Sequence, residues 1–155
     1  MRDFRDLEVW HHAHKLALKA YAIAKKLPAD EQYGLISQIR RAASSIPTNI
    51  AEGCGTATQA ELSRFLQIAM RSASELEYLF LLSKDLGYLT EADISEASVE
   101  VVRVKKMLAA LIGRIRDPAS RRSPSRSGRQ ADKPTSRCGL DATGSPSPSS
   151  CSARG

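Results

Sequence analysis

The sequence is poor in cysteine, in aromatic residues and in long apolar runs. Its three cysteines, Cys54, Cys138 and Cys151, are odd in number and show no C-x-x-C spacing, which excludes a disulfide framework and indicates no zinc site. No apolar run approaches the roughly 18 residues of a membrane span, and the opening MRDFRDLEVW is too charged for a secretory signal. We therefore expect reduced thiols, a cytoplasmic location and no membrane association.

Enzyme signatures are also missing. No glycine loop of the phosphate-binding type is present, because the GCG of residues 53–55 follows a predicted helix instead of a strand, and Glu52 has no nucleophile or base partner at a recognisable spacing. His11 and His14 could hold a metal from one helical face, but no acidic or thiol ligand recurs nearby, and His14 is expected to pack beside Trp10. We expect no enzymatic activity, no cofactor and no metal.

The positive charge is concentrated at the C-terminal end of the chain. The net charge is +6, yet residues 1–117 hold 16 basic and 15 acidic residues, whereas residues 118–155 hold seven basic and two acidic ones. That last segment includes ten Ser, five Pro and four Gly, with Leu140 as its only large aliphatic residue. This composition predicts a folded domain over 1–117 and a disordered tail over 118–155. The tail is either an arginine-rich clamp on nucleic acid, through RRSPSRSGR, or a dispensable extension.

Four segments show apolar residues at alternating spacings of three and four, which is typical of amphipathic helices. The first extends from about Asp6 to Leu27, and the others follow Pro28, Thr58 and Thr90. The inward positions are predicted to be Leu7, Trp10, His14, Ala17, Tyr21 and Ala24; Leu35, Ile39, Ala42, Ile46 and Ile50; Leu62, Phe65, Ala69, Ser72, Leu76, Leu79 and Leu86; and Ile94, Ala97, Val101, Val104, Leu108, Leu111 and Ile115. Four such helices predict an all-α protein, an antiparallel up-down-up-down four-helix bundle.

The connections carry residues that end or begin helices. Gly53 and Gly55 are expected to close the second helix in left-handed conformations, and Gly87 to stop the third. Thr58 is a candidate N-cap with Glu61 in the capping-box position, and Thr90 is a candidate cap for the fourth helix.

Pro47 stands inside the second helix, where it lacks an N–H and its ring would clash with the carbonyl four residues earlier. We expect a bend over 43–48, with Ser44 bonded to backbone groups near it. Asn49 and Glu52 are expected to fix the AEGCG turn that contains Gly53 through hydrogen bonds to the backbone.

Three stretches resemble one protein family: FRDLEVW (4–10), YGLISQIRRAASSIPTNIAEG (33–53) and SELEYLFLLSKDLGYL (74–89). They are similar to the four-helix-bundle proteins encoded by intervening sequences within 23S rRNA genes, and in turn to the Avd accessory proteins of diversity-generating retroelements. The similarity covers about residues 4 to 115. It implies a bacterial bundle that assembles into a ring, typically a pentamer, without known enzymatic activity, and Avd relatives bind nucleic acid and a reverse transcriptase. The chain departs from the family pattern at CGTAT (54–58), where a basic stretch is common, and at Arg71, where a small residue is frequent.

Adjacent arginines in the second helix are candidates for contacts with phosphate. Arg40 and Arg41 lie about 100° and about 200° around the helix from Ile39, so both flank or oppose the core stripe. They either contact phosphate, which guanidinium groups bind bidentately, or pair with carboxylates across a subunit interface. The full set of candidate nucleic-acid-binding residues is Arg40, Arg41, Arg64, Arg71, Lys105 and Lys106.

The end of the third helix is apolar nearly all round. Relative to Leu76, Tyr78 falls at about 200°, Leu81 at about 140° and Leu82 at about 240° around the helix axis. In a monomeric bundle the outer faces of the helices are exposed to solvent, and apolar residues there would be exposed as well. Tyr78, Leu81 and Leu82 therefore predict a homo-oligomer interface. The sequence therefore favours a non-enzymatic, homo-oligomeric scaffold that binds nucleic acid, with structured RNA as the expected ligand. The alternative is a structural or protein-interaction module, for example a reverse-transcriptase accessory, that makes no direct nucleic-acid contact.

Overall fold

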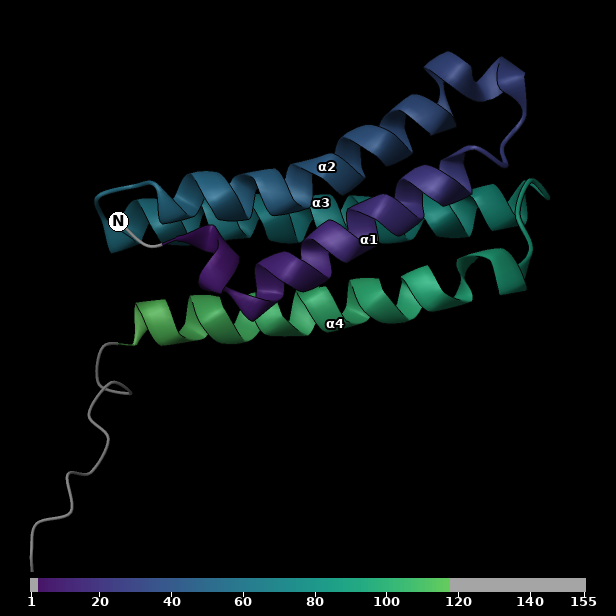
Figure 1. The fold of residues 1–155 in the computed structure, drawn as a ribbon. Helices are drawn as coiled ribbons and strands as arrows, with labels where there is room; N and C mark the ends of the chain where they lie inside the picture. Colours follow the sequence, from purple (N-terminus) through teal and green to yellow (C-terminus); the bar gives the residue numbers. More distant parts are fainter. Residues whose placement is uncertain (1–2, 118–155) are drawn as a thin grey trace, which may run out of the picture. The chain divides into compact units, whose positions relative to one another are not determined.

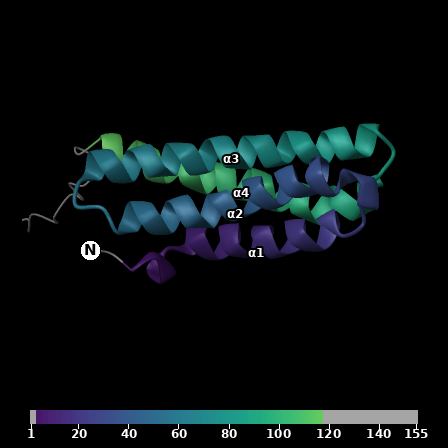
Figure 2. The same ribbon diagram turned by 90° about the horizontal axis from the view of Figure 1, so that it is seen from above.

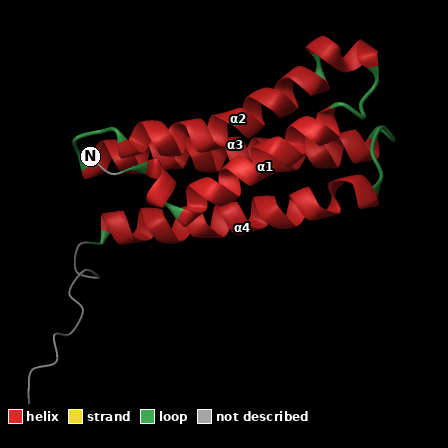
Figure 3. Cartoon of the chain, viewed as in Figure 1, coloured by secondary structure: helices red, strands yellow, loops and turns green. Residues whose placement is uncertain are grey.

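Four long helices joined by short connections make up the part of the chain that the computed structural model describes, residues 3–117 (Figure 1). In chain order these are α1 (Glu8–Ala24), α2 (Leu35–Cys54), α3 (Gln59–Asp85) and α4 (Glu91–Arg116), with the short 3-10 helices η1 (Phe4–Asp6) and η2 (Ala29–Tyr33) before α1 and α2. Successive helices run in opposite directions, and Figure 3 shows helices and loops alone over this range. The predicted all-α four-helix bundle is confirmed, whereas the predicted disordered tail lies outside the described residues.

The helices are arranged in cyclic order, so that each one packs against two neighbours. α1 and α3 both contact α2 and α4, and within the described residues neither diagonal pair packs together. Figure 2, the view from above, shows α1 and α3 on opposite sides of α2. The outer surface shared by α1 and α2 therefore faces away from the surface shared by α3 and α4.

The core is largely aliphatic. The inward-facing positions predicted from the sequence are confirmed best for α2 and α4. All five predicted α2 positions are buried, as are Ile94, Ala97, Val101, Val104 and Leu108 in α4, while Leu111 and Ile115 are half-buried against the core. In α3 the predicted positions from Ala69 to Leu79 are buried, but Leu86 is 52% exposed, so its inward assignment is wrong. Leu86 is the C-cap of α3, one position beyond its last helical residue, Asp85.

The core side of α1 differs from the predicted one. Its buried residues are Val9, Ala13, Leu16, Ala17, Ala20, Ile23 and Ala24. This stripe precedes the predicted one by a single residue, or about 100° of rotation, so only Ala17 and Ala24 belong to both. Trp10 is half-buried, while His14 and Tyr21 are exposed. Both faces of α1 carry the three-four spacing, and packing against α2 and α4 decides which one is buried.

The predicted caps are confirmed, and the glycines need a correction. Thr58 and Thr90 each accept a hydrogen bond from the backbone N–H three residues on, and Gly87 has a φ of 79°. Gly55 has an ordinary right-handed φ of −78°, and Gly53 lies inside α2. The prediction of left-handed glycines at the end of α2 is therefore wrong, because α2 closes with Gly55 still in a helical conformation.

Candidate nucleic-acid interface

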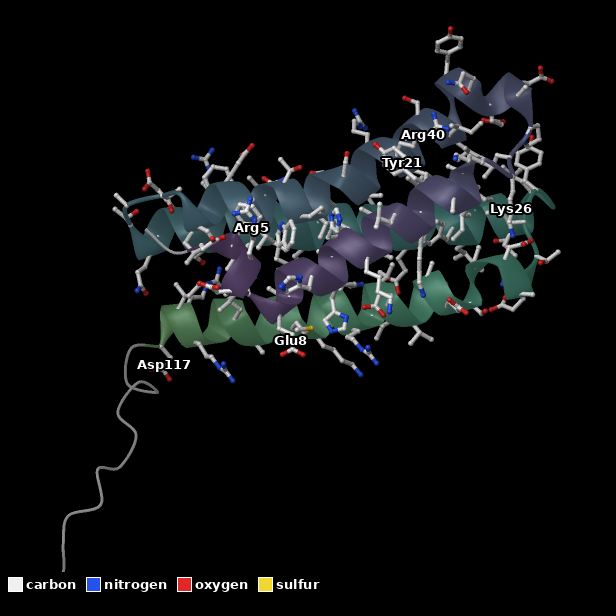
Figure 4. All side chains as sticks on the ribbon, in the orientation of Figure 1. Arg5, Glu8, Tyr21, Lys26, Arg40 and Asp117 are labelled. Carbon is white, nitrogen blue, oxygen red and sulfur yellow. The ribbon has the colours of Figure 1, made fainter. Side chains whose placement is uncertain are left out.

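The six cations predicted to bind nucleic acid lie on several sides of the bundle. Arg40, in α2, places its guanidinium carbon 5.8 Å from the centre of the Tyr21 ring of α1, within reach of a cation–π interaction. Its Nε is buried and makes no hydrogen bond within residues 3–117. Figure 4 shows the two side chains side by side where α2 crosses near α1. Arg40 therefore belongs to the α1/α2 edge.

Three further arginines lie at the edge between α2 and α3. Arg41 is 76% exposed and approaches Glu75 of α3 at 3.6 Å, which forms a loose surface ion pair. Arg71 precedes Glu75 by four residues and so shares its side of α3, and Arg64 lies two turns before Arg71 on the same face. Arg64 and Arg71 are both exposed. These three arginines extend along one edge of the bundle.

The two lysines lie on the other side of α3. Lys105 of α4 donates a 2.6 Å hydrogen bond to Glu77, and two residues along a helix separate Glu77 from Glu75 by about 200°. Lys106 lines an open groove of about 320 Å³ between α3 and α4, with Met70 among its other walls. Lys105 and Lys106 therefore do not join the arginines on one surface.

A second feature of the α1/α2 surface was missed from the sequence. No Asp or Glu occurs from residue 9 to 29, which hold four lysines and three histidines, or from residue 32 to 51, which hold two arginines. The carboxylates of the bundle are concentrated on α3 and α4. The signal was legible in the sequence as two long acid-free stretches, but only the cyclic order of the helices places both stretches on one surface.

The edge between α1 and α4 marks where this basic surface ends. Lys19 donates to Glu96 at 2.8 Å, and Lys26 donates to Asp93 at 2.5 Å. Lys19, with a smaller contribution from Lys15, holds the pKa of Glu96 below its usual value. Lys26 first, and then the Thr90 cap, lower the pKa of Asp93 strongly. The acidic groups of α4 thus face the basic edge of α1.

The part of α2 around Pro47 is stabilised by hydrogen bonds within the helix. The helix continues through the proline and changes direction near its middle (Figure 1), in line with the predicted bend. Ser44 Oγ donates to the Arg41 carbonyl at 3.2 Å, as expected. Asn49 Nδ2 donates back to the Ser45 carbonyl at 2.8 Å, so the prediction that Asn49 fixes the turn is wrong.

The turn after α2 is fixed by other groups. Gly55 N–H donates to the backbone carbonyl of Glu52 at 3.0 Å, whereas the Glu52 side chain is exposed. Thr56 Oγ1 donates to the Gly53 carbonyl at 2.7 Å. Gly53 is buried, and a Cβ there would lie 3.0 Å from the Cβ of Phe65, which means that α3 packs directly on its backbone. Glu52 therefore acts through its backbone, and Gly53 through its lack of a side chain.

The predicted oligomer interface lies on the α3/α4 side. Tyr78 and Leu81 are 59% and 47% exposed, and both line a groove of about 460 Å³ whose opposite wall includes Ile94. Leu82 is only half-buried and packs against the bundle's own core. The apolar surface that α3 exposes here thus consists of Tyr78 and Leu81.

His11 and His14 serve local structure. His11 Nε2 lies 2.7 Å from the Arg5 carbonyl, and the His14 ring stacks on that of Trp10. Within residues 3–117 no three His, Cys, Asp or Glu side chains come together as a metal site would require. None of the helices described is long and apolar enough to cross a membrane.

Comparison with known proteins identifies the family. Residues 5–110 match the family described as 23S rRNA-intervening sequence protein. The chain belongs to this family. A similar fold is found in the crystal structure of a protein of unknown function from the S23 ribosomal protein family of Bacteroides thetaiotaomicron, with a TM-score of 0.63 and 24% identity over 68% of this chain and 95% of that one. Comparison with curated proteins gave no match. The predicted membership of the 23S rRNA-intervening sequence family is confirmed.

Proposed function

We propose that this member of the 23S rRNA-intervening sequence family is a non-enzymatic, homo-oligomeric scaffold that binds nucleic acid, with structured RNA as the ligand. The observation that carries the proposal is the basic α1/α2 surface, on which neither α1 after Glu8 nor α2 before Glu52 contributes a carboxylate. Phosphate backbones bind such surfaces because lysine and arginine displace the counterions that the nucleic acid has condensed. An acid-free surface also avoids repulsion between carboxylates and phosphates.

The predicted binding residues divide accordingly. Arg40 and Arg41 belong to the proposed surface, whereas Arg64 and Arg71 lie on the outer face of α3, fourteen and seven residues before Tyr78. Lys105 is engaged by Glu77 on the opposite side, and Lys106 lies beside it. A rigid duplex contacting α1 and α2 would not reach these two lysines.

We assign self-association to the α3/α4 surface, which faces away from the α1/α2 surface. Tyr78 and Leu81 expose apolar area on α3 next to the α3/α4 groove, and burying such area against another copy is favourable by about 25 cal/mol per Å². An interface there leaves the α1/α2 surface of every copy free for RNA. A pentameric ring and a reverse-transcriptase partner are expectations that come from the family and from Avd proteins.

A charge-reversal experiment tests the location of the binding surface. The full chain is titrated against a labelled structured RNA by fluorescence anisotropy at several salt concentrations, alongside the variants Lys15→Glu/Lys25→Glu on α1 and Lys106→Glu/Arg114→Glu on α4. All four side chains are solvent-accessible, so the two variants are matched in charge. The α1 variant should bind more weakly. The slope of its log affinity against log salt concentration should decrease in magnitude by the amount expected for about two lost phosphate contacts. The α4 variant should behave as the parent.

Two results would contradict the proposal. Equal losses in both variants would mean that binding follows net charge instead of this surface, and absence of binding at low salt would remove nucleic acid as a ligand. The same titration on a chain ending at residue 117 separates the contribution of the basic tail.

The alternative is a protein-interaction module without nucleic-acid contact. It is favoured by the partners that three candidate cations already have within the chain: Arg40 has Tyr21, Arg41 has Glu75 and Lys105 has Glu77. The variant Arg40→Glu/Arg41→Glu discriminates between the two, with light scattering and RNA anisotropy as readouts. Lost RNA binding by an intact oligomer supports the scaffold, and dissociation into monomers supports the interaction module.

A further inference from the structure

A row of aromatic rings follows α1 outside the core. Trp10 and His14 stack with their ring planes 8° apart and their centres 5.1 Å apart, and Tyr21 lies two turns further along the same face. His14 is exposed and Tyr21 is 41% exposed, so each ring presents surface to solvent. We name Trp10, His14 and Tyr21 the aromatic row. All three belong to the stripe that the sequence pattern predicted to be buried, of which the structure buries only Ala17 and Ala24.

The row is held rigidly at both ends. At one end, the ring of Phe4 in η1 packs against that of Trp10 with the ring centres 4.8 Å apart. The guanidinium carbon of Arg5 lies 5.0 Å from the centre of the Phe4 ring. At the other end Arg40 approaches Tyr21, and Figure 4 shows Arg5 and Arg40 near opposite ends of α1. Rings that are already fixed lose little conformational entropy when a ligand stacks on them.

The spacing suits a short single strand. A helix rises about 1.5 Å per residue, which puts His14 and Tyr21 about 10 Å apart along α1, close to the length of three stacked nucleotides at about 3.4 Å each. Beyond Tyr21, Lys25 follows by one turn on the same face and is exposed. Three rings followed by a cation thus share one line of α1, and aromatic rings beside basic groups are what surfaces that bind unpaired nucleotides combine.

Charge decides which occupant the row favours. No carboxylate occurs between Glu8 and Asp30, so the line of rings lies in a purely basic part of the chain. A second copy that offered the same face would bring lysines against lysines, whereas a phosphate backbone is complementary.

We infer that the aromatic row binds unpaired nucleotides of RNA, with bases stacked on the outer faces of His14 and Tyr21 and phosphates contacted by Lys25 and Arg40. This inference rests on the proposed function and adds to it the part of the RNA that is bound. Loops and ends of a structured RNA carry such unpaired bases, while a continuous duplex keeps its bases stacked and out of reach. Base stacking on one aromatic ring changes affinity about tenfold.

The test uses the full chain and two labelled probes of equal length, an unstructured RNA 12-mer and an RNA duplex. Trp10 is the only tryptophan of the chain, so its fluorescence reports on the row directly. The single strand should bind more tightly than the duplex, and the Trp10 emission should change with the same midpoint as the anisotropy. His14→Ala and Tyr21→Leu should each weaken single-strand binding about tenfold, while Tyr21→Phe, which keeps the ring, should bind as the parent.

The matched control is Leu18→Ala. Leu18 is 61% exposed on α1 between His14 and Tyr21 in sequence but has no ring, so its loss should leave RNA affinity unchanged. Thermal unfolding followed by circular dichroism checks that each variant is folded.

Three outcomes overturn the inference, and they differ in what they leave standing. RNA binding that the ring variants do not weaken removes the stacking site but keeps the proposed function. Lack of binding to either probe, and to structured RNA, removes both. If Leu18→Ala and Tyr21→Leu instead dissociate an oligomer, and Trp10 emission follows protein concentration without RNA, the row is a contact between copies.

Discussion

Glu100 is the one buried charged side chain within residues 3–117, and it joins α4 to α1. Its carboxylate is hydrogen-bonded to Nδ1 of His12 and lies 3.8 Å from the Arg103 guanidinium. A carboxylate loses most of its hydration when it is buried, and it is tolerated there because it is paired. The pair therefore holds one helix-to-helix contact in a fixed register instead of adding to surface charge.

Removal of this carboxylate should be costly. We expect Glu100→Ala to lower the free energy of unfolding by about 2 kcal/mol, because the variant removes the hydrogen bond between Glu100 and His12 and opens a small cavity beneath α1. Urea denaturation measures the change. The matched control is Glu96→Ala, one turn earlier in α4, whose exposed and solvent-screened pair with Lys19 should contribute much less than the buried pair. Equal effects would mean that the buried pair has no special role.

At the scale of elements, the junction of α2 and α3 depends on the absence of a side chain. Gly53 is a helical residue on whose backbone Phe65 and Leu62 pack, each with an atom 3.0 Å from where a Cβ would stand. The sequence suggested a glycine needed for its backbone conformation, but the structure shows a glycine needed for close approach. The distinction is invisible to a sequence pattern, because the neighbour that fills the space comes from another helix.

Two glycine substitutions separate these roles. Gly53→Ala should destabilise the bundle by about 1–2 kcal/mol, since overpacking against α3 outweighs the better helix propensity of alanine. Gly113→Ala, inside α4 where a Cβ would meet nothing within 4 Å, should stabilise it by about 0.5–1 kcal/mol. Thermal or urea unfolding measures both. A stabilising Gly53→Ala would show that α3 can move away without cost.

At the scale of the whole bundle, the carboxylates are segregated to one side. The α1/α2 side carries cations without carboxylates, and the α3/α4 side carries the paired charges together with the exposed Tyr78 and Leu81. The proposed function assigns the α1/α2 side to RNA and the α3/α4 side to contacts between copies. The segregation depends on the cyclic order of the four helices, which brings the acid-free stretches of α1 and α2 together.

Association through the α3/α4 side can be tested by placing charge on it. Tyr78→Asp/Leu81→Asp should dissociate the oligomer, because burying two carboxylates at an interface costs more than the apolar contact returns. Light scattering over a range of protein concentrations measures the mass. Leu18→Asp, which puts a charge on the exposed side of α1, is the control and should leave the mass unchanged. An oligomer that survives the first variant and not the second would move the interface to α1.

The sequence by itself determined that the protein is a bundle of four helices, where each helix begins and ends to within a few residues, and which family it belongs to. Hydrophobic spacing, threonine caps and Gly87 act locally, so they can be interpreted without a structure. Only the tertiary structure decided which face of α1 is buried, why Gly53 is glycine, and that the candidate cations lie on different sides. Each of these depends on a neighbour far away in the chain, and α1 alone offers two apolar stripes between which its own sequence cannot choose.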